Sequence, residues 1–204
     1  LVNWQAGDGS ALTLPMTIKS TASIVDPVPA GGGLINMCQS LGFDAEHRPI
    51  VSYHKHGPDG NTQAYAARLE DGVWTYYQLS DWDYRWEFSG GGSIGAEIRL
   101  GGATVRSDGH LSMTWWHLKK GKGIWKLDAS DLKVVGAYPE PDADLPEEIE
   151  TVQLDYPEMT VRTAAGRGDR PEGGERFMLK WETLPAHRDR PREEIPPASE
   201  LRLF

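Results

Sequence analysis

Side chains that can transfer protons or bind carboxylates gather in one stretch of the sequence, from residue 49 to residue 79. Tyr53, His54 and His56 lie in a run typical of a β-strand, and Arg68 lies in the next such run. Tyrosine and histidine act as general acids and bases, and arginine binds a carboxylate through two parallel hydrogen bonds. Polar and aromatic groups on rigid strands indicate a surface that binds a carbohydrate or another flat polar ligand.

The register of this hairpin decides which of these groups share a face. Side chains alternate along a strand, so Tyr53 faces away from His54. A regular hairpin closed by residues 57–61 would place His54 opposite Ala64 and put Arg68 on the face of His54. A single bulge would place Arg68 with Tyr53 instead, and the sequence leaves both registers open.

The surroundings of Arg68 also allow two interpretations. The small residues Ala64, Ala66 and Ala67 precede it, which leaves space beside a guanidinium, for instance over a ligand. In that position Arg68 could hold a ligand carboxylate through a bidentate pair. Alternatively, it forms a salt bridge with an acidic residue such as Asp83 or Glu87.

The aromatic residues divide into core and candidate binding residues. Trp74 and Trp125 each follow a tight turn at matching positions of two similar strands, which indicates packing between repeats. Trp82 and Trp115 are the better candidates for stacking on a sugar. Arg85, close to Trp82 in the sequence, adds a cation to the same region.

Other kinds of site find little support. Cys38, the single cysteine, excludes an intrachain disulfide, and it has no metal-ligand spacing to His54, His56, His110 or His117. Residues 89–93 are rich in glycine but lack the lysine and following helix of a phosphate-binding loop. There is no GxSxG nucleophile motif. We therefore expect no cofactor.

Composition narrows the possible partners. The net charge of −9 argues against non-specific binding to nucleic acid or to an anionic membrane. It does not argue against an acidic sugar, because a few arginines can dominate a small site. No run of residues is long enough to span a membrane, and no signal peptide is visible. Since the chain begins at Leu1, within a strand-like run, we expect a processed or truncated start.

Repeated strand patterns predict an all-β fold. Strand-like runs at 34–41, 49–56, 62–70 and 73–79 are followed by runs at 96–101, 111–117, 123–128 and 133–138. The offset of roughly 60 residues is near that of β-propeller blades. We therefore predict one β-propeller domain over residues 1–204, with blade-like repeats at 34–79 and 94–138. A third, partial unit follows at 159–163, 176–183 and 200–203.

The remaining segments are expected to be loops. The acidic connector Pro139–Glu150 contains proline and is predicted to be a solvated loop rather than a helix. The segment Ala164–Glu175, rich in glycine, arginine and proline, is predicted to be another loop. The charged, proline-containing run His187–Ser199 is expected to be extended on the surface.

Two long motifs, YHKHGPDGNTQAYAARL and SDWDYRWEFSGGGSI, resemble the BNR-repeat propeller family that includes ulvan lyases and other uronate-directed polysaccharide lyases. The C-terminal WETLPAHRDRPRE and PPASELRLF also resemble the ends of those proteins. The resemblance implies the C-terminal half of a propeller of about seven blades, of which this chain would supply about three to four. It also implies an N-terminal half as partner and an extracellular or periplasmic location.

Membership of that family would imply β-elimination at a uronic acid. A cation neutralises the C6 carboxylate, a base removes the C5 proton, and an acid protonates the leaving oxygen. The resemblance makes Tyr53 a candidate base or acid and Arg68 the candidate neutraliser, with His54 in the same catalytic pocket. Residues expected to bind the substrate, an acidic polysaccharide, are Arg85, His117, Trp82 and Trp115.

The sequence departs from the lyases in two respects. The histidines of their N-terminal blades are absent, and Trp115–Trp116 stands where a tyrosine is expected. A non-catalytic glycan-binding propeller is therefore the alternative to a lyase. A sialidase-like glycoside hydrolase is a third possibility, although no arginine triad or Tyr/Glu pair can be picked out.

Overall fold

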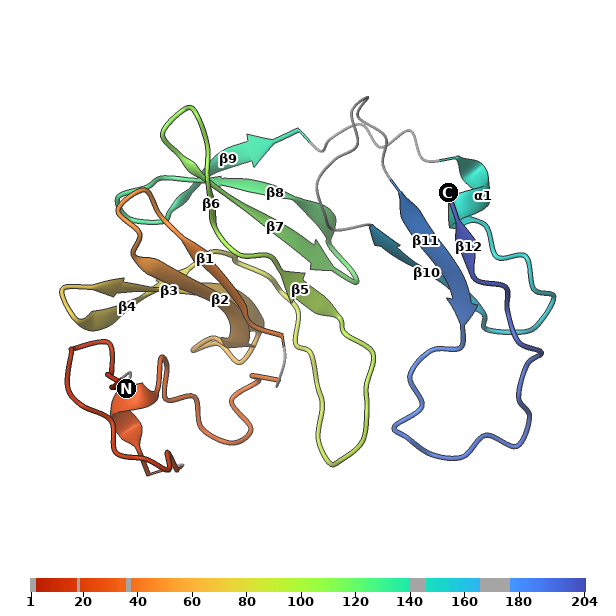
Figure 1. Cartoon of the computed structure of the whole chain (residues 1–204), viewed down its shortest axis with the longest axis horizontal. Helices are drawn as coiled ribbons and strands as arrows, with labels where there is room; N and C mark the ends of the chain where they lie inside the picture. The colour runs from red at the N-terminus through yellow and green to blue at the C-terminus, as the bar shows by residue number, and fades with distance from the viewer. Residues whose placement is uncertain (1–2, 18, 36–37, 140–145, 166–176) are drawn as a thin grey trace. The chain divides into compact units, whose positions relative to one another are not determined.

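The computed structural model describes residues 3–17, 19–35, 38–139, 146–165 and 177–204 (Figure 1). The chain divides into two compact units. The first contains residues 1–89 and 96–140, and the second contains residues 90–95 and 141–204. Among the described residues, no helix is long and apolar enough to cross a membrane.

The first sheet of this unit is an antiparallel meander of β1 (Ser40–Phe43), β2 (Pro49–His56), β3 (Thr62–Glu70) and β4 (Val73–Gln78). Local sequence explains the tightest connection. Asp71 and Gly72 form the two-residue turn between β3 and β4, with φ of 49° and 83°. Positive φ at both positions is what such hairpins require, and Asp-Gly is a favoured pair for it. The predicted first strand, residues 34–41, lies earlier than β1, and residues 36–37 fall outside the described residues.

The second sheet repeats this order of parts. It contains β5 (Ile98–Leu100), β7 (Leu111–His117), β8 (Gly121–Leu127) and β9 (Val134–Tyr138), with β6 (Thr104–Val105) also paired to β7. Every strand pair is antiparallel. Four-stranded antiparallel meanders are the units from which propeller blades are built. The predicted all-β fold with blade-like sheets is therefore confirmed, while the number of blades stays a prediction.

The hairpin of β2 and β3 is regular. His54 pairs with Ala64 and Ile50 pairs with Arg68. Arg68 therefore shares the face of His54, and Tyr53 lies on the opposite face. Of the two registers that the sequence allowed, the one without a bulge is correct.

The two sheets of the first unit pack against each other. Ala64 and Ala66 are completely buried, and the Ser52 hydroxyl donates to the Gly101 carbonyl at 2.9 Å. The two sheets approach each other so closely that a methyl group on Gly42 would lie 2.2 Å from the Ala103 carbonyl oxygen. The space expected beside the alanines for a ligand is therefore filled by the second sheet.

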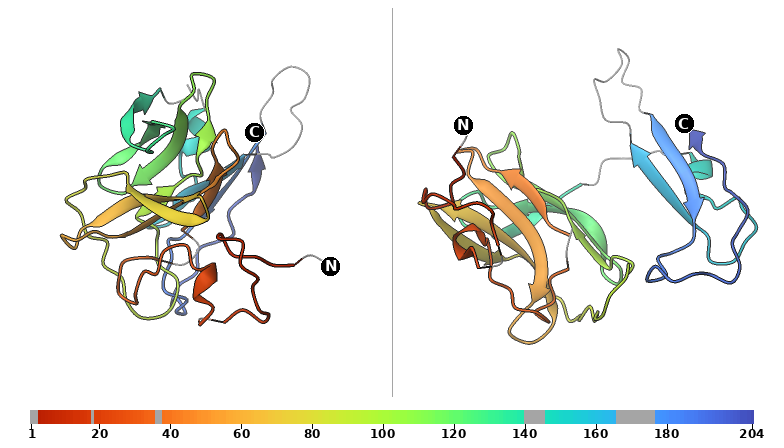
Figure 2. Two further views of the ribbon diagram at one scale, coloured as in Figure 1. Left: turned by 90° about the vertical axis from the view of Figure 1, so that its left-hand side faces the viewer. Right: turned by 60° about the horizontal axis from the view of Figure 1, so that its bottom comes forward.

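Each sheet turns its aromatic face toward the segment that precedes it in the chain. On the first sheet, Tyr53 and Tyr65 pack against Val25 and Val28 of the N-terminal segment, which also contains the short helix η1 (Thr21–Ser23). Trp74 belongs to this cluster, as Trp125 does to the matching face of the second sheet. Figure 2 shows the N-terminal segment beside the first sheet from two further directions.

The second unit is a small antiparallel sheet of β10 (Thr160–Ala165), β11 (Met178–Thr183) and β12 (Arg202–Leu203). The one-turn helix α1 (Glu147–Glu150) buries Ile149, so part of the connector predicted as a solvated loop is ordered instead. Residues 140–145 of that connector, and most of the predicted loop Ala164–Glu175, lie outside the described residues.

Candidate functional site

The connector between the two sheets runs across the beginning of β3 and is held there by side chains of that strand. Gln63 donates to the Trp82 carbonyl and accepts from the Trp82 amide, both at 2.8 Å. The Thr62 amide donates to the Tyr84 carbonyl at 2.7 Å, and the Trp86 amide donates to the Thr62 hydroxyl at 2.9 Å. These contacts fix where Trp82, Tyr84 and Trp86 lie.

An aromatic cluster forms where this connector meets the ends of the second sheet's strands. We define it as Trp82, Tyr84, Trp115, His117 and Trp125. Trp115 and Trp125 stack with their ring centroids 5.3 Å apart, and Trp82 lies 6.1 Å from Trp115. Trp82 is 9% exposed, while Trp115 and Trp125 are half-buried. The cluster thus keeps some indole surface open to a ligand.

His117 anchors the cluster at the end of β7. Its Nδ1 accepts from the backbone amides of Lys119 at 2.9 Å and Lys120 at 3.3 Å, so the neutral ring carries its proton on Nε2. The ring meets Trp82 and Tyr84 edge-on, each with centroids 4.6 Å apart. Burial, with the Lys120 charge, lowers the pKa of His117. His117 thus orders the aromatic rings, and its predicted role in substrate binding stays a prediction.

His54 is likewise buried and neutral. Its Nδ1 lies 2.8 Å from the Gly33 carbonyl, to which it donates, and its ring contacts Trp86 at a centroid distance of 4.9 Å. Burial lowers the pKa of His54 to about 4. Its Nε2 is enclosed and has no hydrogen-bond partner among the described residues.

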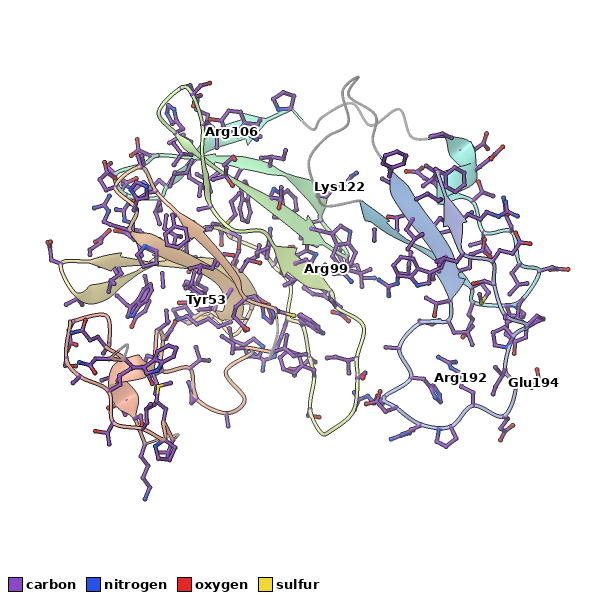
Figure 3. The ribbon with its side chains drawn as sticks, viewed as in Figure 1. Tyr53, Arg99, Arg106, Lys122, Arg192 and Glu194 are labelled. Atoms are coloured by element: carbon purple, nitrogen blue, oxygen red, sulfur yellow. The ribbon has the colours of Figure 1, made fainter. Side chains whose placement is uncertain are left out.

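Cationic side chains border the aromatic cluster. The turn between β7 and β8 contains Lys119 and Lys120, and Lys120 forms an ion pair with Asp83, next to Trp82. Figure 3 shows Lys122 near this turn, at the beginning of β8. Arg85 donates to the Gly60 carbonyl at 2.5 Å and pairs with Glu87. Of the cations beside these indoles, Lys120 and Arg85 are thus already paired with acidic side chains of the connector.

Tyr53 lies apart from this cluster, on the other face of the first sheet (Figure 3). It is 2% exposed, and its hydroxyl donates to Asp26, which also accepts from Lys55 at 2.6 Å. Burial and the hydrogen bond to Asp26 raise the pKa of Tyr53 far above its usual range. The phenol therefore keeps its proton at neutral pH, whereas a base must be able to lose it.

Arg68 is 2% exposed, and its guanidinium is hydrogen-bonded to other groups of the protein. Its Nε donates to Glu70 at 2.6 Å, its Nη1 to the Ala129 carbonyl at 2.5 Å, and its Nη2 to the Ser130 carbonyl. Of the two interpretations drawn from the sequence, the geometry matches the salt bridge, but with Glu70, and with Asp44 at 3.7 Å, rather than with Asp83 or Glu87.

The structure thus brings Trp82, Trp115 and His117 into one cluster. Arg85 lies on the same connector, and His54 contacts Trp86 of that connector. Tyr53 and Arg68 lie on opposite faces of the first sheet. The catalytic roles of Tyr53, His54 and Arg68 stay predictions. Sequence reasoning missed Gln63 as the residue that holds the connector. Its only signal was a polar residue within an apolar strand. Among the described residues, no group of three or more histidine, cysteine or acidic side chains is placed to hold a metal ion.

Comparison with known protein families finds a match for part of the chain. Residues 1–82 match the model of a BNR repeat-containing family, which spans the N-terminal segment and the first sheet as far as Trp82. No curated protein matches the sequence. Among solved structures, a novel α-L-arabinofuranosidase from Clostridium thermocellum ATCC 27405 is similar, with 11% identity and a TM-score of 0.33. The match covers 81% of this chain and 50% of the arabinofuranosidase, so the chain spans half the length of that protein.

Proposed function

We propose that this chain is part of a carbohydrate-active β-propeller and binds an acidic polysaccharide beside the aromatic cluster. One observation carries the proposal: His117, whose ring meets Trp82 of the aromatic cluster, also accepts from the amides of Lys119 and Lys120 in the basic turn. Aromatic rings offer flat apolar surfaces, on which sugar rings stack. Ammonium groups beside them supply charges for the carboxylates of a uronic acid.

The sequence match supports the carbohydrate part of this proposal. The BNR repeat model covers the first sheet, whose residue Gln63 holds the connector that carries Trp82. The lysines of the turn between β7 and β8 support the acidic part. With a net charge of −9, the protein would repel a polyanion overall, so binding requires a local basic surface.

A second candidate is uronate-directed lyase activity of a longer protein, supported by the resemblance of the two motifs to such lyases. It would use β-elimination, with a base for the C5 proton and a cation on the carboxylate. Because Tyr53 and Arg68 are already bonded to Asp26 and Glu70, groups outside this chain would carry most of the chemistry. This chain would then contribute binding.

Affinity electrophoresis in gels that contain polygalacturonate, alginate or neutral dextran tests the proposal. We expect retardation by the two polyuronates only, decreasing steeply with salt because ion pairs at a surface are screened. Charge reversal of Lys119 and Lys120 to Glu should weaken retention about tenfold, if each contact contributes up to about 1 kcal/mol and the new charges repel. The control is Lys133→Glu, which changes an exposed lysine of the turn between β8 and β9.

Two results would contradict the proposal: no retardation by either polyuronate, or equal retardation of the Lys119/Lys120 variant and the Lys133 control. Trp115→Ala tests the aromatic part separately, since it leaves the charge unchanged. The absorbance of unsaturated uronate, measured with the longest natural form of the protein, tests the lyase candidate. Binding without this product would support the non-catalytic alternative.

A further inference from the structure

The second sheet has a basic side, opposite the side that carries the aromatic cluster. Side chains alternate along β7, so Trp116 points away from Trp115, and Arg99 shares its side because Arg99 and Trp116 pair. Ser112 lies on this side too; it pairs with Lys126, and its hydroxyl accepts from the Arg106 Nε at 2.8 Å. Figure 3 shows Arg99 and Arg106 on this sheet. We define the basic face by three cations and the two rings beside them: Arg99, Arg106, Lys126, Trp116 and Tyr138.

The composition of this sheet differs from that of the whole chain. The protein contains 30 acidic residues and 21 lysines and arginines, yet none of the strands β5 to β9 contains an aspartate or a glutamate. Among the described residues, the only carboxylate bonded to the basic face is that of Asp108, which accepts from Lys126 and Tyr138, both at 2.8 Å. Asp108 therefore neutralises Lys126 and fixes the ring of Tyr138.

Each arginine of the basic face lies against an aromatic ring. The guanidinium carbon of Arg99 lies 5.7 Å from the Trp116 ring centroid, and that of Arg106 lies 5.0 Å from the Tyr138 centroid. A ring beside a guanidinium restricts its orientation without using the in-plane N–H donors. Binding an oxyanion then costs less side-chain entropy, because the donors are already oriented.

Arg99 and Arg106 are both exposed, and neither forms an ion pair among the described residues. The other arginines of the first unit, Arg48, Arg68 and Arg85, each pair with an aspartate or a glutamate. In a chain with an excess of acidic residues, two oriented arginines without such a partner indicate a surface that binds an external anion.

The spacing of the two arginines fits a ligand with several charges. Arg99 pairs with Trp116, whereas Arg106 bonds to Ser112, four residues earlier on β7, which is about 13 Å along an extended strand. A small anion cannot reach both guanidiniums, but a linear polyanion can. We propose that the basic face is a second binding surface for the acidic polysaccharide, whose carboxylates Arg99 and Arg106 bind. The ligand class rests on the proposed function, but the surface uses no residue of the aromatic cluster or of the basic turn.

Labelling with phenylglyoxal, followed by mass spectrometry of peptides, measures the reaction of each arginine separately. Arg99 and Arg106 should react readily in the free protein, because both are exposed. With polygalacturonate at about ten times the Kd, only about one tenth of the sites is free, so both should react about tenfold more slowly. Arg202 of the second unit, whose side chain is 42% exposed, should react at the same rate with and without the polymer. The protection should persist when Lys119 and Lys120 are changed to Glu.

A double variant tests the contribution of the two guanidiniums to binding. Arg99→Gln with Arg106→Gln should weaken retention in polygalacturonate gels about tenfold, because two surface contacts to carboxylates are lost. The matched control, Arg202→Gln with Lys133→Gln, makes the same change in charge at exposed positions and should leave retention unchanged. Near-ultraviolet circular dichroism of each variant checks that the fold is retained.

Three results would overturn the proposal. Arg99 and Arg106 that do not react in the free protein would show that the chain itself covers the basic face. Equal labelling with and without polygalacturonate would show that the polymer does not bind there; if the gels still retard the protein, the proposed function stands without this second surface. Protection by a single-stranded oligonucleotide at a lower concentration than by polygalacturonate would assign the surface to nucleic acid instead.

Discussion

Replacing Arg68 tests whether this residue stabilises the fold or serves a ligand. The guanidinium is buried, and it joins Glu70 on β3 to the Ala129 and Ser130 carbonyls of the second sheet's last turn. Removing one partner of a buried ion pair costs about 3–5 kcal/mol, since the other charge is left without a partner. Arg68→Ala should therefore lower the free energy of unfolding by about that amount, a large share of the total of about 5–15 kcal/mol typical of a protein domain.

Urea denaturation followed by tryptophan fluorescence measures this loss. The control is Arg85→Ala, since the Arg85 side chain is 41% exposed and pairs with an exposed Glu87. Its loss should cost less than about 1 kcal/mol. Arg68→Lys should recover only part of the stability, because an ammonium cannot reach Glu70 and two carbonyls in the planar geometry of a guanidinium.

The double variant Arg68→Met with Glu70→Gln refines the test, since it removes both charges and retains most of the volume. We expect it to be more stable than Arg68→Met alone, because no carboxylate at position 70 is then left without its cation. A loss below about 1 kcal/mol for Arg68→Ala, together with lost polyuronate binding or turnover, would refute the reasoning. Arg68 would then serve the ligand.

Three further predictions concern residues near the two faces of the first sheet. Gln63→Ala should lower the free energy of unfolding by about 1–3 kcal/mol, because the Trp82 amide and carbonyl lose their partner, and it should weaken polyuronate retention in affinity gels. His54 has a pKa lowered from 6.5 to about 4, so its neutral form stabilises the fold above pH 6.5, and this stability is lost as the pH falls toward 4. The loss should reach about 3 kcal/mol and should be absent in His54→Phe when urea midpoints are compared across that range. Tyr53→Phe should lower the free energy of unfolding by about 1.5–3 kcal/mol, because it removes a hydrogen bond to the charged Asp26. It should leave polyuronate binding unchanged. Weakened binding with full stability would instead point to a direct role for the hydroxyl.

Strand positions could be predicted because they depend on local sequence. The Asp71–Gly72 turn requires positive φ at two successive residues, which few other pairs allow, so it fixes the β3–β4 hairpin. The sequence predicts a strand from residue 34, but β1 begins at Ser40, because the run before it resembles a strand and pairs with nothing among the described residues. Pairing with β2, a tertiary contact, determines where that strand begins.

The site could be predicted only in part, for a related reason. Trp82, Trp115 and His117 were recognised from residue type, and the structure places their rings together. The role of Arg68 depends on Ala129 and Ser130, which are some 60 positions away in the sequence and reach it only when the sheets pack. No local pattern encodes that contact. Small residues beside an arginine fit a ligand or a neighbouring sheet equally well.

In the second unit, the segment 148–154 (here called the strap) precedes β10 and is held through hydrogen bonds to its backbone as well as by the buried Ile149 side chain. Lys180 donates to the carbonyls of Glu148 and Thr151, both at 2.6 Å, and Glu182 accepts from the amides of Gln153 and Leu154, at 2.8 Å and 2.9 Å. Since every residue type offers a carbonyl, positions 148 and 151 are free to change during evolution while docking persists. Positions 153 and 154 exclude proline, which has no amide hydrogen. Homologous sequences should therefore vary at positions 148, 151, 153 and 154 while Ile149, Lys180 and Glu182 change little.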